Sequence, residues 1–290
     1  MSRKNLKSVL KYGRERLREF GIDGYALDAE VLLRHAAGLD RVTLLTNHEI
    51  KLNDQVIEEY EKYLLLRQRR MPVAYITKNV EFMSLPMHID KRALIPRPDT
   101  EILVEGALAL IDGLSNRNSG RPISVLELCT GSGCVAIALA YYRPGIQVTA
   151  TDLYDDALQL ASGNAKCYSA CSNIKFLKGD LYTPVSGLKF DIVIANPPYI
   201  PSADIETLCD DVKLYEPAPA LDGGADGLDF YRRLCGGAMN MLNPGGFVMF
   251  EIGFDQGAAV AKLLTEAGFI TEVIPDLSGH DRVVTGAPRT

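Results

Sequence analysis

Apolar segments of strand length alternate with helical segments from residue 123 onward. The expected strands cover residues 123–128, 147–151, 174–177, 190–195 and 246–251, and the expected helices cover 134–142, 154–167 and 230–242. One more helix and two terminal strands are expected after residue 251. Strand–helix–strand repeats of this kind fold into a mostly parallel sheet covered by helices. We therefore expect an α/β fold for this part of the chain.

Residues from about 4 to 70 have a different pattern, with apolar side chains at helical spacing. The first apolar face consists of Leu6, Val9, Leu10, Leu17 and Phe20. Asn53 or Asp54 can cap a later helix. That helix ends in the basic run 67–70, and Pro72 breaks it. Basic residues suit a helix C-terminus, so we expect a structural role for this run.

Residues 73–96 join the two patterns. Apolar and polar side chains alternate over 80–83 and 87–90, on either side of Ser84-Leu85-Pro86, which predicts a β-hairpin. We therefore expect three parts: a helical domain over 1–72, a hairpin linker over 73–96 and an α/β domain over 97–290.

Composition narrows the possible partners. The chain of 290 residues has a formal net charge of −6, whereas nucleic-acid-binding surfaces are usually basic. We therefore expect no direct nucleic-acid binding.

No apolar run reaches membrane length, so we expect a cytoplasmic protein without membrane contact. The six cysteines form no CxxC pair and the four histidines are scattered, so we expect reduced thiols and no metal site.

A glycine-containing turn follows the first strand of the α/β segment. It reads Cys129-Thr130-Gly131-Ser132-Gly133 and leads into a helix. Glycine at a strand-to-helix turn allows a ligand to approach the backbone closely. The next strand ends at Asp152, where a carboxylate can accept both ribose hydroxyl hydrogens. These features fit a dinucleotide and S-adenosylmethionine equally well.

The third strand leads to Gly179-Asp180-Leu181. In sheets of this type, that strand end lies beside an adenine ring. Asp180 can accept a hydrogen bond from the exocyclic amine, and Leu181 can pack on the ring. No obvious nicotinamide half-site follows, which favours S-adenosylmethionine.

The fourth strand delivers Asn196-Pro197-Pro198-Tyr199 to the carboxyl edge of the sheet. An amide or aromatic amine nitrogen is a poor nucleophile because its lone pair is delocalised. The Asn196 side-chain oxygen and the Pro197 carbonyl can accept its two N–H hydrogens, and Tyr199 offers a flat face for a planar group. Catalysis then consists of positioning and electrostatics, without a histidine base. The tetrapeptide predicts a methyltransferase that acts on a planar nitrogen.

These residues resemble the glutamine methyltransferases that modify peptide chain release factors, the HemK/PrmC type. The resemblance covers nearly the full length. Besides the tetrapeptide, the similar segments are 70–76, 94–101, 215–217, 220–228, 251–253, 256–257, 276–279 and 281–282.

The resemblance implies a Rossmann-like class I methyltransferase sheet and an N-terminal helical domain that binds the release factor. It implies that residues 129–133, Asp152, Leu181 and Asn196 line the S-adenosylmethionine site, whose product is S-adenosylhomocysteine. It also implies that residues 196–199 hold the glutamine of a Gly-Gly-Gln motif for methylation at N5, and that residues 97–101 shape the pocket mouth.

Some positions depart from the usual family pattern. Cys129 and Lys78 stand where glycine is common. Glu127 stands where aspartate is common, and Asp99 stands where glutamate is usual. The longer Glu127 is expected to shift a contact near the methionine end of the cofactor.

Other functions use the same tetrapeptide. The alternatives are a DNA adenine-N6 methyltransferase acting on a flipped base, a ribosomal-protein glutamine methyltransferase, and a non-catalytic binding module on the same scaffold. The acidic charge disfavours the first, and the intact tetrapeptide with Asp152 disfavours the last.

Overall fold

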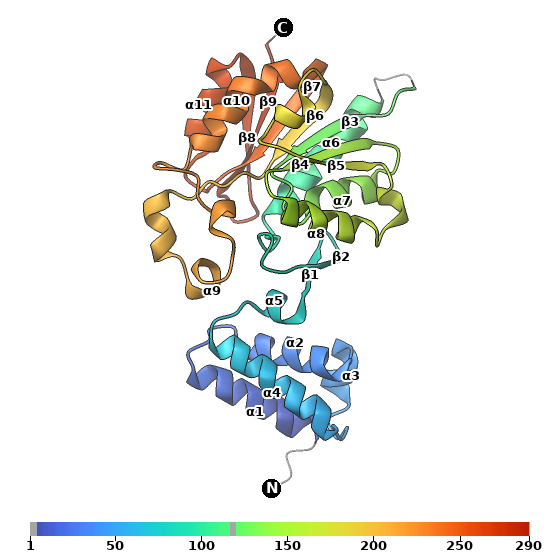
Figure 1. Cartoon of the computed structure of the whole chain (residues 1–290), viewed down its shortest axis with the longest axis vertical. Helices are drawn as coiled ribbons and strands as arrows, with labels where there is room; N and C mark the ends of the chain where they lie inside the picture. The colour runs from blue at the N-terminus through green and yellow to red at the C-terminus, as the bar shows by residue number, and fades with distance from the viewer. Residues whose placement is uncertain (1–4, 117–119, 290) are drawn as a thin grey trace. The chain divides into compact units, whose positions relative to one another are not determined.

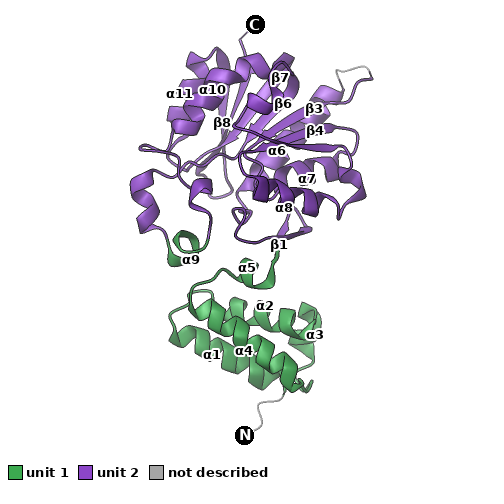
Figure 2. Cartoon of the chain, in the orientation of Figure 1, with its two compact units in different colours: residues 1–79, 209–215 green, residues 80–208, 216–290 purple. Residues whose placement is uncertain are grey.

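The computed structural model describes residues 5–116 and 120–289, which form two compact units (Figures 1 and 2). Unit 1 comprises residues 1–79 and 209–215, and unit 2 comprises residues 80–208 and 216–290. The contacts thus divide the chain at residue 79, and they assign a short later segment to the first unit. The finer division at residues 72 and 96 stays a prediction.

Unit 1 is helical, as the apolar spacing predicted. Its helices are α1 (Leu6–Glu19), α2 (Tyr25–Ala37), α3 (Arg41–Thr46), α4 (Asp54–Gln68) and α5 (Val73–Thr77). Asn53 caps α4, with its side-chain oxygen 2.8 Å from the Val56 N–H. The core contains Leu6, Val9, Leu10 and Leu17 of the expected apolar face. Phe20 does not join them and is 55% exposed, because it caps the C-terminus of α1 beyond the last buried turn.

A buried arginine ties the later segment to the helices of unit 1. Arg67, at the end of α4, donates from Nε to Asp28 of α2 at 2.7 Å. Its Nη2 donates to Asp211 of α9 (Asp210–Lys213), also at 2.7 Å. The Arg67 side chain is only 9% exposed, and the two carboxylates accept hydrogen bonds from donors that water cannot reach freely. The structural role expected for the basic run is therefore confirmed at Arg67.

The predicted hairpin consists of β1 (Asn79–Phe82) and β2 (Leu85–His88). Its turn lies earlier than the sequence indicated. Met83 and Ser84 have φ values of 50° and 58°, which is the left-handed pair that a tight two-residue hairpin requires. Pro86 was expected in the turn but lies within β2, where the two-stranded sheet leaves its nitrogen without a required partner.

Unit 2 is built on a seven-stranded sheet in the order β5-β4-β3-β6-β7-β9-β8. The strands are β3 (Ser124–Leu128), β4 (Gln147–Asp152), β5 (Ile174–Lys178), β6 (Phe190–Ala195), β7 (Leu242–Glu251), β8 (Phe269–Pro275) and β9 (Asp281–Pro288). The first five in chain order pair in parallel, and β9 is antiparallel to both β7 and β8. This is the expected α/β fold. β7 begins four residues before the predicted strand, at Leu242 rather than 246.

Helices cover both faces of the sheet (Figure 1). They are α6 (Thr100–Ser115), α7 (Cys134–Tyr142), α8 (Asp155–Ala165), α10 (Asp229–Met241) and α11 (Gly257–Glu266). Along β6, Ile192 and Ile194 point into the core with α6 and α7, whereas Val193 and Ala195 point into the core with α10 and α11. Because successive strand residues face opposite sides, burial on both faces explains why β6 is apolar from Ile192 to Ala195.

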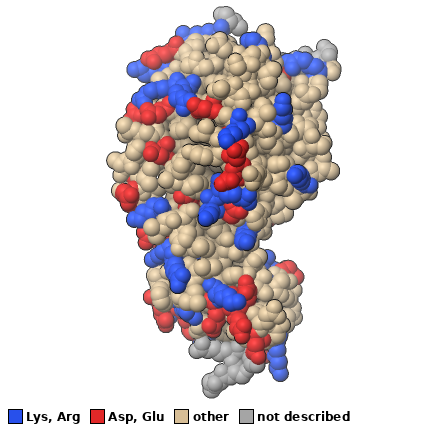
Figure 3. Space-filling model, viewed as in Figure 1, with Lys and Arg blue, Asp and Glu red and all other residues tan. Residues whose placement is uncertain are grey.

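None of the helices in the described residues combines the length and the apolarity that a membrane span needs. On the face of the molecule shown in Figure 3, basic and acidic side chains are interspersed.

Asp191 joins the start of β6 to the start of β3. Its carboxylate accepts hydrogen bonds from both terminal nitrogens of Arg121, from the backbone and hydroxyl of Ser124, and from Asn243. Burial alone would raise the pKa of Asp191, but these hydrogen bonds outweigh that effect and lower the pKa to about 2. The charged form is therefore the one that stabilises the fold.

Asp191→Asn should lower the free energy of unfolding by about 2 kcal/mol at pH 7. Because the folded-state pKa is depressed, this contribution is present above the ordinary value of 3.8 and disappears as the pH falls toward 2. Urea unfolding of wild type and variant at pH 7 and pH 3 measures it, with the exposed Asp156→Asn as control. Equal unfolding midpoints at pH 7 would contradict this role.

Candidate active site

The registers of the parallel strands bring several loops to one edge of the sheet. Leu128, the last residue of β3, pairs with Thr151 of β4 on one side and with Ala195 of β6 on the other. The chain leaves β3 toward β4 and reaches β6 only later. This is the switch point at which α/β sheets bind ligands beyond their carboxyl ends.

The turn after β3 has three residues with left-handed backbone. Cys129, Gly131 and Gly133 have φ values of 60°, 54° and 81°. A side chain at Gly133 would meet Ala161 of α8 at 2.9 Å, so glycine is required where the two helices pack closely. A side chain at Gly131 would meet only Ala93, at 3.9 Å, so this part of the turn leaves room for a ligand. Thr130 and Ser132 are buried.

Asp152 ends β4 beside this turn. One carboxylate oxygen accepts the Gly131 N–H at 2.9 Å, and the other accepts the Tyr154 N–H at 3.0 Å. Burial raises the pKa of Asp152, against these backbone hydrogen bonds. Each oxygen keeps a second lone pair, so the carboxylate can still accept two hydroxyl hydrogens. The residues present therefore fit the ribose of S-adenosylmethionine.

Glu127 has a structural task that the sequence did not reveal. Its Oε2 accepts the Thr130 hydroxyl at 2.6 Å and the Ala136 N–H at 3.1 Å, which ties the turn to the first turn of α7. Burial raises the pKa of Glu127 to about 8. The contact to the methionine end of the cofactor expected for this residue stays a prediction.

Asp180 and Leu181 follow β5, which pairs with β4 at this edge. The Gly179 N–H donates to the Asp152 carbonyl at 3.0 Å, so the two loops are adjacent. Leu181 is buried and has a φ of 45°. Asp180 pairs with Arg233 of α10 at 2.5 Å, so a hydrogen bond to an adenine amine has to share this carboxylate.

The tetrapeptide follows β6 in the middle of the edge. Pro197 and Pro198 are buried, whereas Asn196 and Tyr199 are partly exposed. The Asn196 side-chain nitrogen donates to the Thr100 hydroxyl at 3.2 Å. That donation leaves the carboxamide oxygen available as an acceptor for a substrate, which is the role the sequence predicted for it.

The backbone after the tetrapeptide is held in place from three sides. Gln256 Nε2 donates to the Tyr199 carbonyl at 2.9 Å, and its Oε1 accepts the Gly253 N–H at 2.9 Å. A side chain at Gly223 would approach Tyr199 Cα to 2.7 Å, and one at Gly227 would approach the Tyr199 carbonyl oxygen to 2.4 Å. These glycines let the 221–228 segment lie directly on the tetrapeptide.

Glu251 and Gln256 are site residues to which the sequence assigned no role, and Thr100 was expected only as part of the 97–101 segment at the pocket mouth. Glu251 ends β7, and Ala195 pairs with Phe250 in the preceding register position, so Glu251 adjoins Asn196. It is 1% exposed. A carboxylate at the end of an apolar strand was the available signal, but the sequence alone does not show that β7 lies next to β6.

Two ion pairs join the segments that flank this edge. Arg97 pairs with Glu216 at 2.5 Å, and the second Glu216 oxygen accepts the Ile95 N–H at 3.1 Å. Arg282 of β9 pairs with Asp99 at 3.1 Å. Residues 97–101 are therefore anchored to distant parts of unit 2, and their role at a pocket mouth stays a prediction.

This sheet order and its carboxyl edge define a Rossmann-like class I methyltransferase. Residues 101–211 match the methyltransferase small domain, and residues 8–77 match the PrmC N-terminal domain. The fold resembles the N-terminal domain of human METTL16 solved in complex with SAH, with a TM-score of 0.51 and 15% identity over 84% of this chain and 87% of that one.

Full-length relatives are more specific. The chain is 41% identical to the release factor glutamine methyltransferase of Clostridium acetobutylicum over 92% of this chain and 93% of the relative. It is 39% identical to the enzyme of the same name from Geobacter sulfurreducens over 97% and 96%. The chain belongs to the release factor glutamine methyltransferase family.

Asp152→Ala should weaken S-adenosylmethionine binding about 10- to 100-fold, because hydrogen bonds to a charged group are lost. Isothermal titration calorimetry with the cofactor measures this. Asp156→Ala, an exposed change four residues further on, is the matched control and should bind like wild type. Unchanged affinity in Asp152→Ala would remove this residue from the cofactor site.

Proposed function

We propose that this enzyme transfers a methyl group from S-adenosylmethionine to the side-chain nitrogen N5 of the glutamine in the Gly-Gly-Gln motif of peptide chain release factors. The observation that carries the proposal is the placement of Asn196-Pro197-Pro198-Tyr199 beside the glycine turn and Asp152. The full-length relatives support a protein glutamine as acceptor over the nucleic-acid base that the tetrapeptide alone allows. A translation factor as substrate favours a cytoplasmic reaction.

The residues of this chain act by binding and orienting. Bound S-adenosylmethionine supplies an electrophilic sulfonium methyl group. The Asn196 side-chain oxygen and the Pro197 carbonyl accept the two hydrogens of the glutamine amide, and this aims its nitrogen toward the cofactor side of the edge. Pro198 has no N–H to compete as a donor. The Tyr199 ring lies against the planar amide and the charge that moves during transfer.

Tyr199 remains a neutral phenol throughout the neutral range. Burial raises its pKa to about 12, and the negative charge of Glu251 adds to the effect. The ring therefore acts as a surface for the substrate and does not serve as a base near pH 7.

Asn196→Ala tests the proposed pair of acceptors for the substrate amide, the Asn196 side-chain oxygen and the Pro197 carbonyl, which we call the amide clamp. It should lower kcat for release-factor methylation at least about 100-fold, because an acceptor aimed at the reacting group is lost. Cofactor binding should weaken but stay detectable, since the glycine turn and Asp152 are intact. Transfer of labelled methyl from S-adenosylmethionine to a purified release factor measures kcat, and undiminished turnover would refute the clamp.

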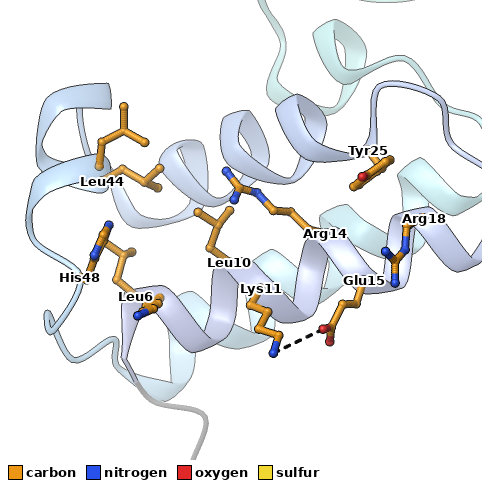
Figure 4. Close-up of a pocket in the computed structure, with 11 residues that line it drawn as sticks. Leu6, Leu10, Lys11, Arg14, Glu15, Arg18, Tyr25, Leu44 and His48 are labelled. Atoms are coloured by element: carbon orange, nitrogen blue, oxygen red, sulfur yellow. Dashed lines mark ion pairs between the residues drawn. The ribbon is translucent and has the colours of Figure 1, made fainter.

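Unit 1 offers a docking surface for the release factor. A groove of about 360 Å³ lies on its helices (Figure 4). The apolar lining residues are Leu6, Leu10, Tyr25, Leu44 and Leu45. The charged and titratable ones are Lys7, Lys11, Arg14, Glu15, Arg18 and His48.

The charge around this groove contrasts with the net charge of −6 for the whole chain. Glu15, the one acidic lining residue, is paired with Lys11 at 3.7 Å. Arg14 is paired with Glu30 at 3.7 Å. Lys7 and Arg18 make the rest of the rim basic around an apolar floor. This combination suits an acidic segment of the release factor with apolar side chains on one face.

The double variant Lys7→Glu with Arg18→Glu should raise the KM for the release factor about 3- to 10-fold without changing kcat, because rim charges mainly affect encounter. The effect should shrink at high salt. Lys175→Glu with Lys262→Glu changes the net charge equally on unit 2 and should leave KM unchanged. Equal KM values for the two double variants would exclude the groove as the docking surface.

A further inference from the structure

Glu251 is a buried carboxyl group with an unsatisfied oxygen beside the tetrapeptide. Among the described residues, its Oε2 has no hydrogen-bond partner although the side chain is 1% exposed. Its backbone carbonyl accepts the Tyr231 hydroxyl at 2.7 Å, which fixes the end of β7. A buried, unsatisfied carboxyl group costs stability, so its presence at this edge calls for a function.

The other contacts of the carboxyl group lead to Asn196. Glu251 adjoins Asn196 through the pairing of β6 with β7, and hydrogen bonding from Thr100 and Asn196 opposes the rise in the pKa of its carboxyl group. The Asn196 nitrogen also donates to the Thr100 hydroxyl at 3.2 Å. Thr100 is 2% exposed, so this cluster is shielded from competing water. The three side chains come from α6, the end of β6 and the end of β7.

The direction of these hydrogen bonds is set by the carboxylate. An ionised carboxylate only accepts, so the Thr100 hydroxyl must donate to it and can then only accept from Asn196. Asn196 must therefore present its NH₂ group to Thr100 and Glu251. We propose that Glu251 is a positioning residue that, partly through Thr100, fixes the Asn196 carboxamide with its oxygen toward the substrate amide.

This inference rests on the proposed role of Asn196 and assigns the group that enforces it. A flipped Asn196 would present a donor to the N–H groups of the substrate, which cannot accept it. Asparagine side chains are nearly symmetrical in shape, so packing alone does not select one orientation. The acceptor-only character of Glu251 supplies the selection.

The surroundings of Glu251 make its charge, and with it the orientation of the Asn196 carboxamide, sensitive to pH. Burial raises the pKa of Glu251 to about 7, against the hydrogen bonds from Thr100 and Asn196 and the attraction of Arg282. The other groups that act on it electrostatically are Asp99 before α6, Tyr199, Tyr231 of α10 and Cys134 of α7. Burial raises the pKa values of Tyr199 and Cys134 to about 12 and that of Tyr231 well above its ordinary value, so none of these three titrates near neutrality.

Glu251→Gln is the direct test, because an amide can donate as well as accept. For wild type, kcat should rise with pH through about 7. The variant should have a kcat about 10- to 100-fold lower at pH 8 and no rise through this range. Its cofactor affinity should be unchanged. Its melting temperature should be equal or higher, since a buried charge is removed; a purely structural role predicts a lower one.

A substrate-independent readout separates this inference from the proposed function. The side-chain amide NMR signals of Asn196, assigned by their loss in Asn196→Ala, should shift with an apparent pKa of about 7 in wild type and not in Glu251→Gln. Thr100→Val should resemble Glu251→Gln, and Thr100→Ser should recover part of the lost kcat. Glu272→Gln, an exposed change on β8, should behave like wild type.

The two hypotheses fail in different ways. Amide signals in Glu251→Gln that titrate as in wild type, or a variant with the wild-type kcat and pH profile, would overturn the role of Glu251. Absence of methyl transfer to any release factor, with normal titration of the amide signals, would overturn the proposed function and leave the role of Glu251 supported.

Discussion

The pairing of β3 with both β4 and β6 is the constraint on which the rest of the structure depends. Leu128 adjoins Thr151 on one side and Ala195 on the other. The residues at the carboxyl ends of these strands are the glycine turn, Asp152 and Asn196. A cofactor cradle and an amide-binding loop are therefore neighbours because of strand order. The close glycine contacts and the Gln256 hydrogen bonds then hold the tetrapeptide loop at that edge.

The sequence predicted the parts of the structure that depend on local pattern. The α/β fold and the helical first domain follow from apolar periodicity, and the glycine turn, Asp152 and the tetrapeptide were predicted as strand ends. Pairings between distant segments were not predictable. Glu251 meets Asn196 only because β7 lies beside β6, and Asp180 meets Arg233 only because the segment after β5 contacts α10. The hairpin turn was misplaced because Met83 and Ser84 adopt left-handed backbone that their residue types do not favour.

The two compact units are linked by more than the hairpin. The segment Cys209–Tyr215 follows the tetrapeptide loop in sequence and belongs to the helical unit. Arg67 holds it through Asp211, and the Tyr215 hydroxyl donates to the Arg69 carbonyl at 2.6 Å. Glu216, the next residue, is buried in the catalytic unit and anchors Arg97. The unit proposed to dock the substrate is thus connected through the backbone to the loop proposed to orient it.

The central claim is that the tetrapeptide clamps the amide of one glutamine. Its most direct test is incubation of the enzyme with labelled S-adenosylmethionine and a purified release factor, followed by mass mapping of the labelled peptide. The account predicts a single methyl group on the side-chain nitrogen of the Gly-Gly-Gln glutamine, and no label when that glutamine is replaced. A methyl group on another residue, or label that persists after the replacement, would contradict it.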